Sequence, residues 1–192
     1  FTDITLAMAI APHRAVEAVS LGLRLLVDSS EAVDAIEAAA ESAGASPVFL
    51  KVDCGYGRAG VQPGSANAVA LARRLHASSV IDFRGLLTHG GHSYDCVSVD
   101  EIRVVAAEER DQVVGFAEDL RALGLPVPEV SVGSTPTMVQ VDHLEGVTEM
   151  RPGNYALFDA FQVAIGSCGM DDVAVSVLAT VLGVYPDRVV LD

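Results

Sequence analysis

One stretch of the chain, residues 83–94, places a cluster of reactive side chains at the end of an apolar run. It reads Phe-Arg-Gly-Leu-Leu-Thr-His-Gly-Gly-His-Ser-Tyr. The ring of His89 could stack on a flat ligand or transfer a proton, and the phenol of Tyr94 could donate to a phosphate or carboxylate. An ordinary core histidine is the alternative for His89. A metal site built on His89 and His92 alone would lack ligands.

A second stretch, residues 51–60, follows another apolar run and reads Lys-Val-Asp-Cys-Gly-Tyr-Gly-Arg-Ala-Gly. Its glycine spacing matches the dinucleotide-binding fingerprint. That fingerprint needs an acidic residue at the far end of the next strand, whereas Asp82 comes before the next strand, so the match is weak. Arg58 is better interpreted as a permanently charged donor to an anion, with a bridge between loops as the alternative. Lys51 is the chain's single lysine.

Two further loops offer hydrogen-bond donors. Residues 131–137, Ser-Val-Gly-Ser-Thr-Pro-Thr, and residues 151–155, Arg-Pro-Gly-Asn-Tyr, each follow a short apolar run. Small residues and hydroxyls that turn into a helix are typical of anion-binding loops. In α/β barrels, phosphate sites come from the loops after the last strands. Either loop alone could be a simple turn, but together they favour phosphate.

The elements that must position these loops alternate between strands and helices. The pattern predicts strands at residues 4–10, 23–27, 48–52, 83–87, 129–132 and 147–150, and helices at 13–20, 30–43, 67–77 and 99–123. Continuously apolar strands, each followed by a helix, predict a parallel sheet buried on both faces. We therefore expect an α/β fold, a (β/α)8 TIM-type barrel that is incomplete, with about six βα units. The β-rich runs 173–185 and 188–191 predict the start of a C-terminal β domain.

Composition limits the classes of partner. The chain has 192 residues, a formal net charge of −14 and a mean hydropathy of +0.39. Such acidity argues against nucleic acid and anionic membranes as partners. No apolar run is long enough for a membrane span. Three cysteines without framework spacing favour reduced thiols, which predicts a cytoplasmic protein.

Taken together, these motifs resemble the fold-type III pyridoxal-phosphate family, which includes alanine racemases, D-threonine aldolases and eukaryotic-type D-serine dehydratases. Thr88-His89 is similar to the family's threonine–histidine pair, whose histidine stacks on the cofactor ring. Arg58 resembles the arginine that bonds the cofactor's phenolic oxygen, and Arg151 the arginine that faces the pyridine nitrogen. The resemblance implies catalytic roles for His89, Arg58 and Tyr94. It implies cofactor contacts from the same residues and from Gly133, Ser134, Thr135, Arg151, Gly153, Asn154 and Tyr155.

Within that family, the stretches 89–94, 133–137 and 151–159 look most like the D-serine dehydratase and D-threonine aldolase branch. The resemblance implies a lyase that acts on a D-β-hydroxy amino acid, uses pyridoxal 5'-phosphate with a divalent metal (Zn or Mn), and forms a homodimer. It also implies that the lysine that holds the cofactor lies before residue 1, and that the metal ligands lie after residue 192. We therefore expect residues 1–160 to form a partial barrel and 161–192 to begin the β domain.

Three other interpretations stay open. An amino-acid racemase of the same fold would use a tyrosine of the C-terminal domain instead of a metal. A non-catalytic carrier of pyridoxal phosphate would lack the β domain, so residues 173–191 count against it. A dehydrogenase with a dinucleotide fold is the most distant alternative.

Overall fold

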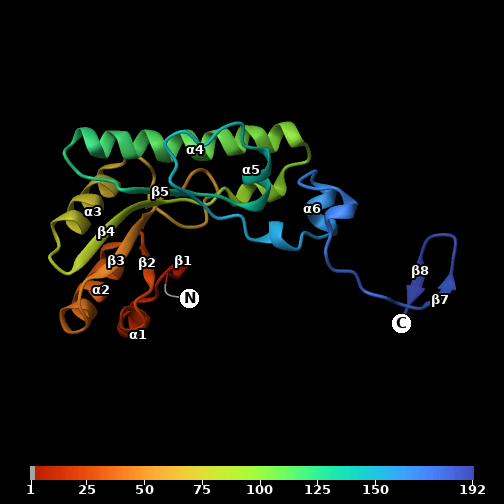
Figure 1. Ribbon diagram of the computed structural model, residues 1–192, viewed down its shortest axis with the longest axis horizontal. Coiled ribbons are helices and arrows are strands. Elements are labelled where there is room, and N and C mark those ends of the chain that lie inside the picture. Colours follow the sequence, from red (N-terminus) through yellow and green to blue (C-terminus); the bar gives the residue numbers. More distant parts are fainter. Residues whose placement is uncertain (1–2) are drawn as a thin grey trace.

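Six parallel strands form one sheet in the computed structural model, which describes residues 3–192. The strands are β1 (Thr5–Ala9), β2 (Arg24–Val27), β3 (Ser46–Lys51), β4 (Ile81–Leu87), β5 (Glu129–Val132) and β6 (Glu149–Met150). Each strand pairs with the next one along the chain, and the sheet curls into a half-barrel (Figure 1). This order confirms the incomplete TIM-type barrel. It differs from the dinucleotide fold, in which the strand order reverses at the binding crevice.

Helices connect the strands, and most of them cover one face of the sheet, whereas the last of them lies away from it (Figure 1). They are α1 (Ala15–Ser20), α2 (Ser30–Ala43), α3 (Ala66–Ala77), α4 (Val99–Ala122), α5 (Thr135–Gln140) and α6 (Ala160–Ala164), with short 3₁₀ helices at Pro12–Arg14, Gly91–Asp95, Asn154–Ala156 and Met170–Asp172. Side chains such as Val33, Leu50 and Leu120 are fully buried between helices and sheet. No helix between residues 3 and 192 combines the length and apolar character needed to cross a bilayer.

The opposite face of the sheet carries a small second cluster, made by Leu26, Phe49 and Leu87. A β-bulge lies beside this cluster, because Val48 pairs with Phe83 while the next residue, Phe49, pairs with Gly85. Gly85 has a φ of +138°, and a Cβ there would lie 1.9 Å from the carbonyl oxygen of Glu129. Only glycine therefore allows β4 and β5 to approach so closely.

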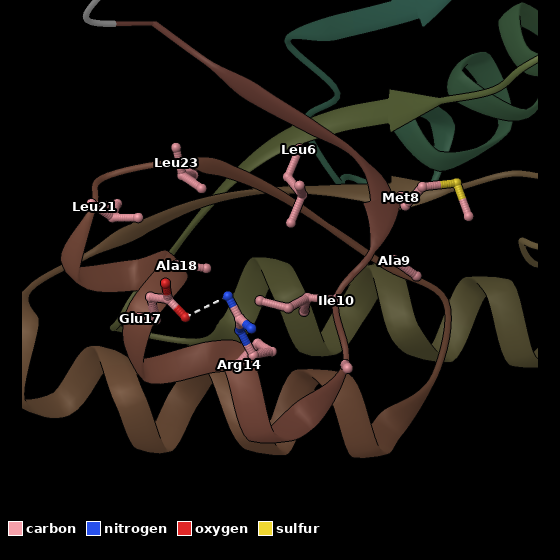
Figure 2. Close-up of a pocket in the computed structure, with 10 residues that line it drawn as sticks. Leu6, Met8, Ala9, Ile10, Arg14, Glu17, Ala18, Leu21 and Leu23 are labelled. Carbon is pink, nitrogen blue, oxygen red and sulfur yellow. Dashed lines mark ion pairs between the residues drawn. The ribbon is translucent and has the colours of Figure 1, made fainter.

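The edge strand β1 leaves an apolar groove exposed. The groove has a volume of about 310 Å³ and lies between β1 and α1 (Figure 2). Its lining includes Leu6, Met8 and Leu21, and its polar feature is an ion pair between Arg14 and Glu17, with 2.7 Å between nitrogen and oxygen. That pair is exposed, and the rest of the lining is apolar.

The C-terminal part departs from the predicted β-rich run. Strand β7 covers Val181–Val184 and pairs in antiparallel fashion with β8 (Val189–Leu191), so the small sheet is present. Residues 173–180 form no strand, although β-branched residues are frequent there. Both strands are largely exposed and extend away from the barrel (Figure 1). A β-branched run without a partner to hydrogen-bond does not form a ladder. The proposed boundary at residue 160 stays a prediction.

Candidate functional site

The ends of four neighbouring strands meet around one cavity of about 310 Å³. Each of the loops after β3, β4, β5 and β6 contributes side chains, as expected for parallel strands whose carboxyl ends share one rim. The lining consists of Ala7, Met8, Arg58, His89, Tyr94, Ser134, Thr135, Arg151, Gly153 and Asn154. Eight of the ten predicted site residues are therefore brought together here.

The other two predicted residues have different positions. Gly133 is not part of the cavity lining, and its φ of +131° and its contact with Arg151 exclude a side chain at this position. Tyr155 is exposed and lines a neighbouring groove with Met138, Val139, Met150 and Pro152. The structure thus places Tyr155 beside the cavity and not in its lining, and its cofactor contact stays a prediction.

The loop after β3 is held by the carboxylate of Asp53. This carboxylate is nearly buried and accepts hydrogen bonds from the backbone N–H groups of Gly55, at 3.1 Å, and Gly57, at 3.0 Å. It also accepts from the side-chain amide of Gln62, at 3.1 Å. The acid thus organises the glycine-rich loop from within. The loop's positive-φ glycines let it turn tightly enough to present Arg58.

His89 is fixed by the neighbouring strand. Its Nδ1 lies 2.8 Å from the carbonyl oxygen of Gly133 and therefore donates its proton there. Burial lowers the pKa of His89, and the positive charges of Lys51, Arg58 and Arg151 lower it further, whereas the bond to Gly133 raises it. The ring is accordingly neutral at pH 7, with Nδ1 protonated and a flat face available for stacking.

Arg151 is held by acceptors on three strands or loops. Its Nε donates to the hydroxyl of Ser131 at 2.8 Å, and its Nη2 donates to the carbonyl of Thr88. The carboxylate of Glu149 lies 3.8 Å from the same Nε. Burial lowers the pKa of Arg151, whereas the nearby charges of Glu109 and Glu149 raise it. The guanidinium is thus fixed and desolvated, while it keeps its charge.

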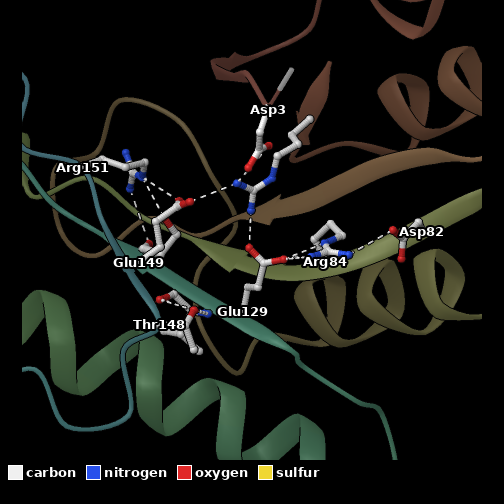
Figure 3. A network of polar contacts seen from close by, with 10 residues as sticks. Asp3, Asp82, Arg84, Glu129, Thr148, Glu149 and Arg151 are labelled. Carbon is white, nitrogen blue, oxygen red and sulfur yellow. Dashed lines mark hydrogen bonds and ion pairs between the residues drawn. The ribbon is translucent and has the colours of Figure 1, made fainter. Parts of the chain in front are cut away.

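A chain of ion pairs continues from Arg151 through the barrel (Figure 3). Glu149 accepts from Arg24 at 3.0 Å and also from the hydroxyl of Ser131. Arg24 in turn donates to Glu129, which also pairs with Arg84. The sequence did not indicate this network, because its members come from four different strands. It ties the position of Arg151 to the opposite end of the sheet.

The positively charged side chains near the cavity repel one another. Lys51 is 5% exposed, and its pKa is lowered to about 8, first by burial and next by the charge of Arg151. Arg58 lowers it further. This cluster, in which Lys51 and Arg151 are desolvated and Arg58 is exposed, is complementary to an anion with more than one charge.

Aromatic side chains complete the surroundings. The ring of Tyr56 lies edge-on to His89, with centroids 6.1 Å apart, and is stacked with His92 at 6.2 Å. Arg58 places its guanidinium carbon 4.9 Å from the centroid of the Tyr56 ring. Tyr94 stacks on Phe161. Sequence reasoning missed Tyr56, because nothing in its spacing separates it from its neighbours in a glycine-rich loop.

The chain is similar to known proteins along nearly its whole length. A family model described as alanine racemase, N-terminal domain, matches residues 2–160. The chain is 42% identical to a D-threo-3-hydroxyaspartate dehydratase of a Delftia species, over 97% of this chain and 51% of the relative. It is 34% identical to a D-serine dehydratase of Dictyostelium discoideum, over 98% of this chain and 52% of the relative. The chain thus spans about half the length of these curated relatives.

Solved structures agree with this assignment. The Delftia dehydratase superposes with a TM-score of 0.88, covering 97% of this chain and 51% of the other. A D-threonine aldolase from Filomicrobium marinum, 24% identical, superposes with a TM-score of 0.78 over 88% of this chain and 47% of the other, which shows the shared fold. From the curled sheet, the family match and these identities, the chain belongs to the alanine racemase N-terminal domain family.

Proposed function

We propose that the full-length protein is a pyridoxal-phosphate-dependent lyase acting on a D-amino acid with a hydroxyl group on its β-carbon. The observation that carries the proposal is the positive charge at the cavity, which Arg58 and Arg151 line and to which the buried Lys51 adds from nearby. Pyridoxal phosphate is a flat ring with a phosphate and a phenolic oxygen, and it matches that charge. The names of the relatives, dehydratases of D-amino acids, support the same reaction class.

The residues of this chain fit the cofactor in type and position. Arg58 would donate to the phenolic oxygen and Arg151 would face the ring nitrogen. His89 would stack on the ring. Ser134, Thr135, Gly153 and Asn154 line the cavity from two adjacent loops and would surround the phosphate, with Gly133 and Tyr155 proposed as further contacts. When bound, the cofactor supplies the electron sink for bond breaking at the substrate's α-carbon.

The chain's own groups set orientation and charge. Arg151 keeps its protons because a guanidinium does not deprotonate in proteins, so it would favour the unprotonated state of a ring nitrogen that it faced. The neutral ring of His89 keeps its proton on Nδ1 through the carbonyl of Gly133. Tyr94 can donate from its phenol toward the substrate carboxylate or the phosphate. A lysine outside this chain would hold the cofactor.

We further propose a divalent metal, Zn or Mn, bound by residues outside this chain and polarising the substrate's β-hydroxyl. One solved form of a D-threo-3-hydroxyaspartate dehydratase is a metal-free mutant, which supports a metal in that relative. Among residues 3–192, no group of three or more His, Cys, Asp or Glu is arranged to hold a metal ion. We also propose that the full-length protein is a homodimer in the cytoplasm.

The experiment is a product analysis on the full-length protein with D-serine, D-threonine and D-threo-3-hydroxyaspartate. A dehydratase releases ammonia and an oxo acid, and an aldolase releases an aldehyde together with glycine when D-threonine is the substrate. We expect one of these outcomes, with activity lost in EDTA and restored by Zn or Mn. Conversion to the L-enantiomer that is indifferent to EDTA would establish a racemase instead. Cofactor binding without any turnover would establish a carrier.

A further inference from the structure

The helix α4 carries a fully buried carboxylate, that of Glu109. Charged side chains are almost never fully buried unless they are paired or hydrogen-bonded. The burial of Glu109 follows from its position on the helix, because it lies four residues from both Val105 and Val113 in the apolar stripe. A glutamate in this stripe needs partners inside the protein.

Its partners are the two loops that carry His89 and Ser134. Oε1 of Glu109 accepts from the backbone N–H of Gly90, at 2.8 Å, and from the backbone N–H of Gly133, at 3.0 Å. One oxygen atom thus joins the loop after β4 to the loop after β5. Each loop is gripped at the residue adjacent to a residue that lines the cavity.

The second oxygen of the carboxylate reinforces the loop after β5. Oε2 accepts from the hydroxyl of Thr137 at 3.0 Å. The same hydroxyl accepts from the backbone N–H of Ser134 at 3.0 Å, within the capping box that starts α5. Glu109 therefore holds Ser134 from both sides, through Gly133 and through Thr137.

The fit leaves no spare room at Gly90. A Cβ at this position would lie 2.7 Å from Oε2 of Glu109 and 3.0 Å from Cγ2 of Thr137. This close approach is an observation independent of the hydrogen bonds, and it shows that the loop is packed directly on the carboxylate.

We propose that Glu109 is a positioning residue of the cofactor site, which fixes His89 and Ser134 relative to each other through backbone hydrogen bonds. This inference rests on the proposed function and extends it to a residue outside the cavity lining. The chain of contacts is complete, because His89 donates to the carbonyl of the same Gly133 whose N–H is bound by Glu109. The proposed role requires an acceptor oxygen at the position of Oε1, because that oxygen accepts both backbone hydrogen bonds, from Gly90 and from Gly133.

The test compares three variants in the full-length protein. Glu109→Leu keeps the approximate size and removes both acceptors. Glu109→Gln keeps one oxygen able to accept from both backbone N–H groups, while its amide faces the Thr137 hydroxyl, which can accept. Val113→Ala is the matched control, because Val113 is fully buried on the same helix and packs in the main core. It perturbs α4 without removing a loop contact.

Two quantities are measured for each variant: the dissociation constant of pyridoxal phosphate, and amide hydrogen exchange of segments 89–93 and 133–137 in the ligand-free protein. For E109L we expect a dissociation constant raised by about tenfold or more, with faster exchange in both segments. For E109Q we expect a dissociation constant within about threefold of that of the wild type, because the hydrogen-bond geometry is preserved. Amide exchange in both segments should stay as slow as in the wild type. V113A should behave like E109Q at these sites.

The proposal is overturned if E109L keeps wild-type affinity and exchange, if E109Q fails as E109L does, or if V113A loosens both loops equally. A Gly90→Ala variant guards against simple misfolding of E109L, because it keeps Glu109 and separates the loop from it. G90A should accelerate exchange in both segments, and unchanged exchange would contradict the proposal. If wild type binds no pyridoxal phosphate, the proposed function fails, while the exchange data still decide whether Glu109 orders the loops.

Discussion

The guanidinium of Arg58 lies over the ring of Tyr56, with 4.9 Å between the guanidinium carbon and the ring centroid. Arg58 itself is exposed, so this contact is what gives a flexible side chain a defined place at the cavity. The same ring touches His89 edge-on. One aromatic side chain therefore lies between two predicted cofactor contacts.

Replacing Arg58 by alanine in the full-length protein should weaken binding of pyridoxal phosphate by about 1.5–3 kcal/mol, the usual worth of a hydrogen bond to a charged group. Absorbance titration of the ligand-free protein measures the change. Arg58→Lys is the control, because it keeps the charge and loses the planar fork. Its affinity for pyridoxal phosphate should fall between those of the wild type and R58A. Unchanged affinity in R58A would remove Arg58 from the site.

Replacing Tyr56 by alanine should weaken the same affinity by about 1–2 kcal/mol, because the cation–π contact and the packing against His89 are lost together. Tyr56→Phe keeps the ring and should cost less than about 0.5 kcal/mol by the same reasoning. Titration of Y56A and Y56F with pyridoxal phosphate measures both losses of affinity. An equal loss in Y56F would mean that the hydroxyl, and not the ring, is the functional part.

Lys51 should make stability depend on pH. Its folded-state pKa of about 8 lies below its ordinary value of 10.5, so the unfolded chain binds more protons between these values and stability rises with pH across that window. Lys51→Met should therefore stabilise the ligand-free protein by about 2–3 kcal/mol at pH 7 and by less than about 1 kcal/mol at pH 10. Urea unfolding at both values measures the difference. An equal gain at both pH values would contradict the assignment.

Two glycines should respond to alanine in opposite ways. Gly85→Ala would force a side chain into the carbonyl of Glu129 at a φ of +138° and should cost about 3 kcal/mol or more. Gly115 lies within α4, and a Cβ there meets nothing within 4 Å, so Gly115→Ala should stabilise by about 0.5–1 kcal/mol. Thermal unfolding of both variants tests the bulge. A tolerated G85A would mean that β4 and β5 are further apart than described.

The ion pairs inside the barrel should matter more than those outside it. The Glu129 side chain is 18% exposed and pairs with Arg24 and Arg84, so Glu129→Ala should cost about 2–3 kcal/mol by removing the partly buried partner that the two arginines share. Asp34 pairs with Arg74 and is 67% exposed, so Asp34→Ala should cost less than about 0.5 kcal/mol. Unfolding in low and high salt separates the two, because only the exposed pair is screened strongly. An equal loss of unfolding free energy in E129A and D34A would show that the network contributes no more to stability than an exposed ion pair.

The sequence predicted the parts of the fold that depend on local pattern. Helix α2 has the predicted bounds, residues 30–43, and β5 has the predicted bounds, residues 129–132. The β-branched run 173–180 was misjudged, because strand formation depends on a partner that sequence spacing does not reveal. The gathering of His89, Ser134 and Arg151 at one rim followed from the parallel sheet.

Other features needed the structure. Glu109 falls within the apolar stripe of α4, so its spacing carried a signal that a charged residue is turned inward, but its partners are backbone groups of distant loops. The network from Arg151 to Arg84 joins four strands, and Arg84 is the unpaired residue of the bulge between β3 and β4. Register at such a bulge is a property of packing between strands and not of either strand's sequence.

The order of the sheet has a consequence for how the chain acquires its structure during synthesis. Every strand from β1 to β6 pairs with the strand made just before or just after it, and contacts between near neighbours in sequence form quickly because little chain entropy is lost in closing them. Each new strand that leaves the ribosome can thus pair with the edge strand of the sheet that has already formed. The half-barrel can be laid down one unit at a time, in the direction of translation.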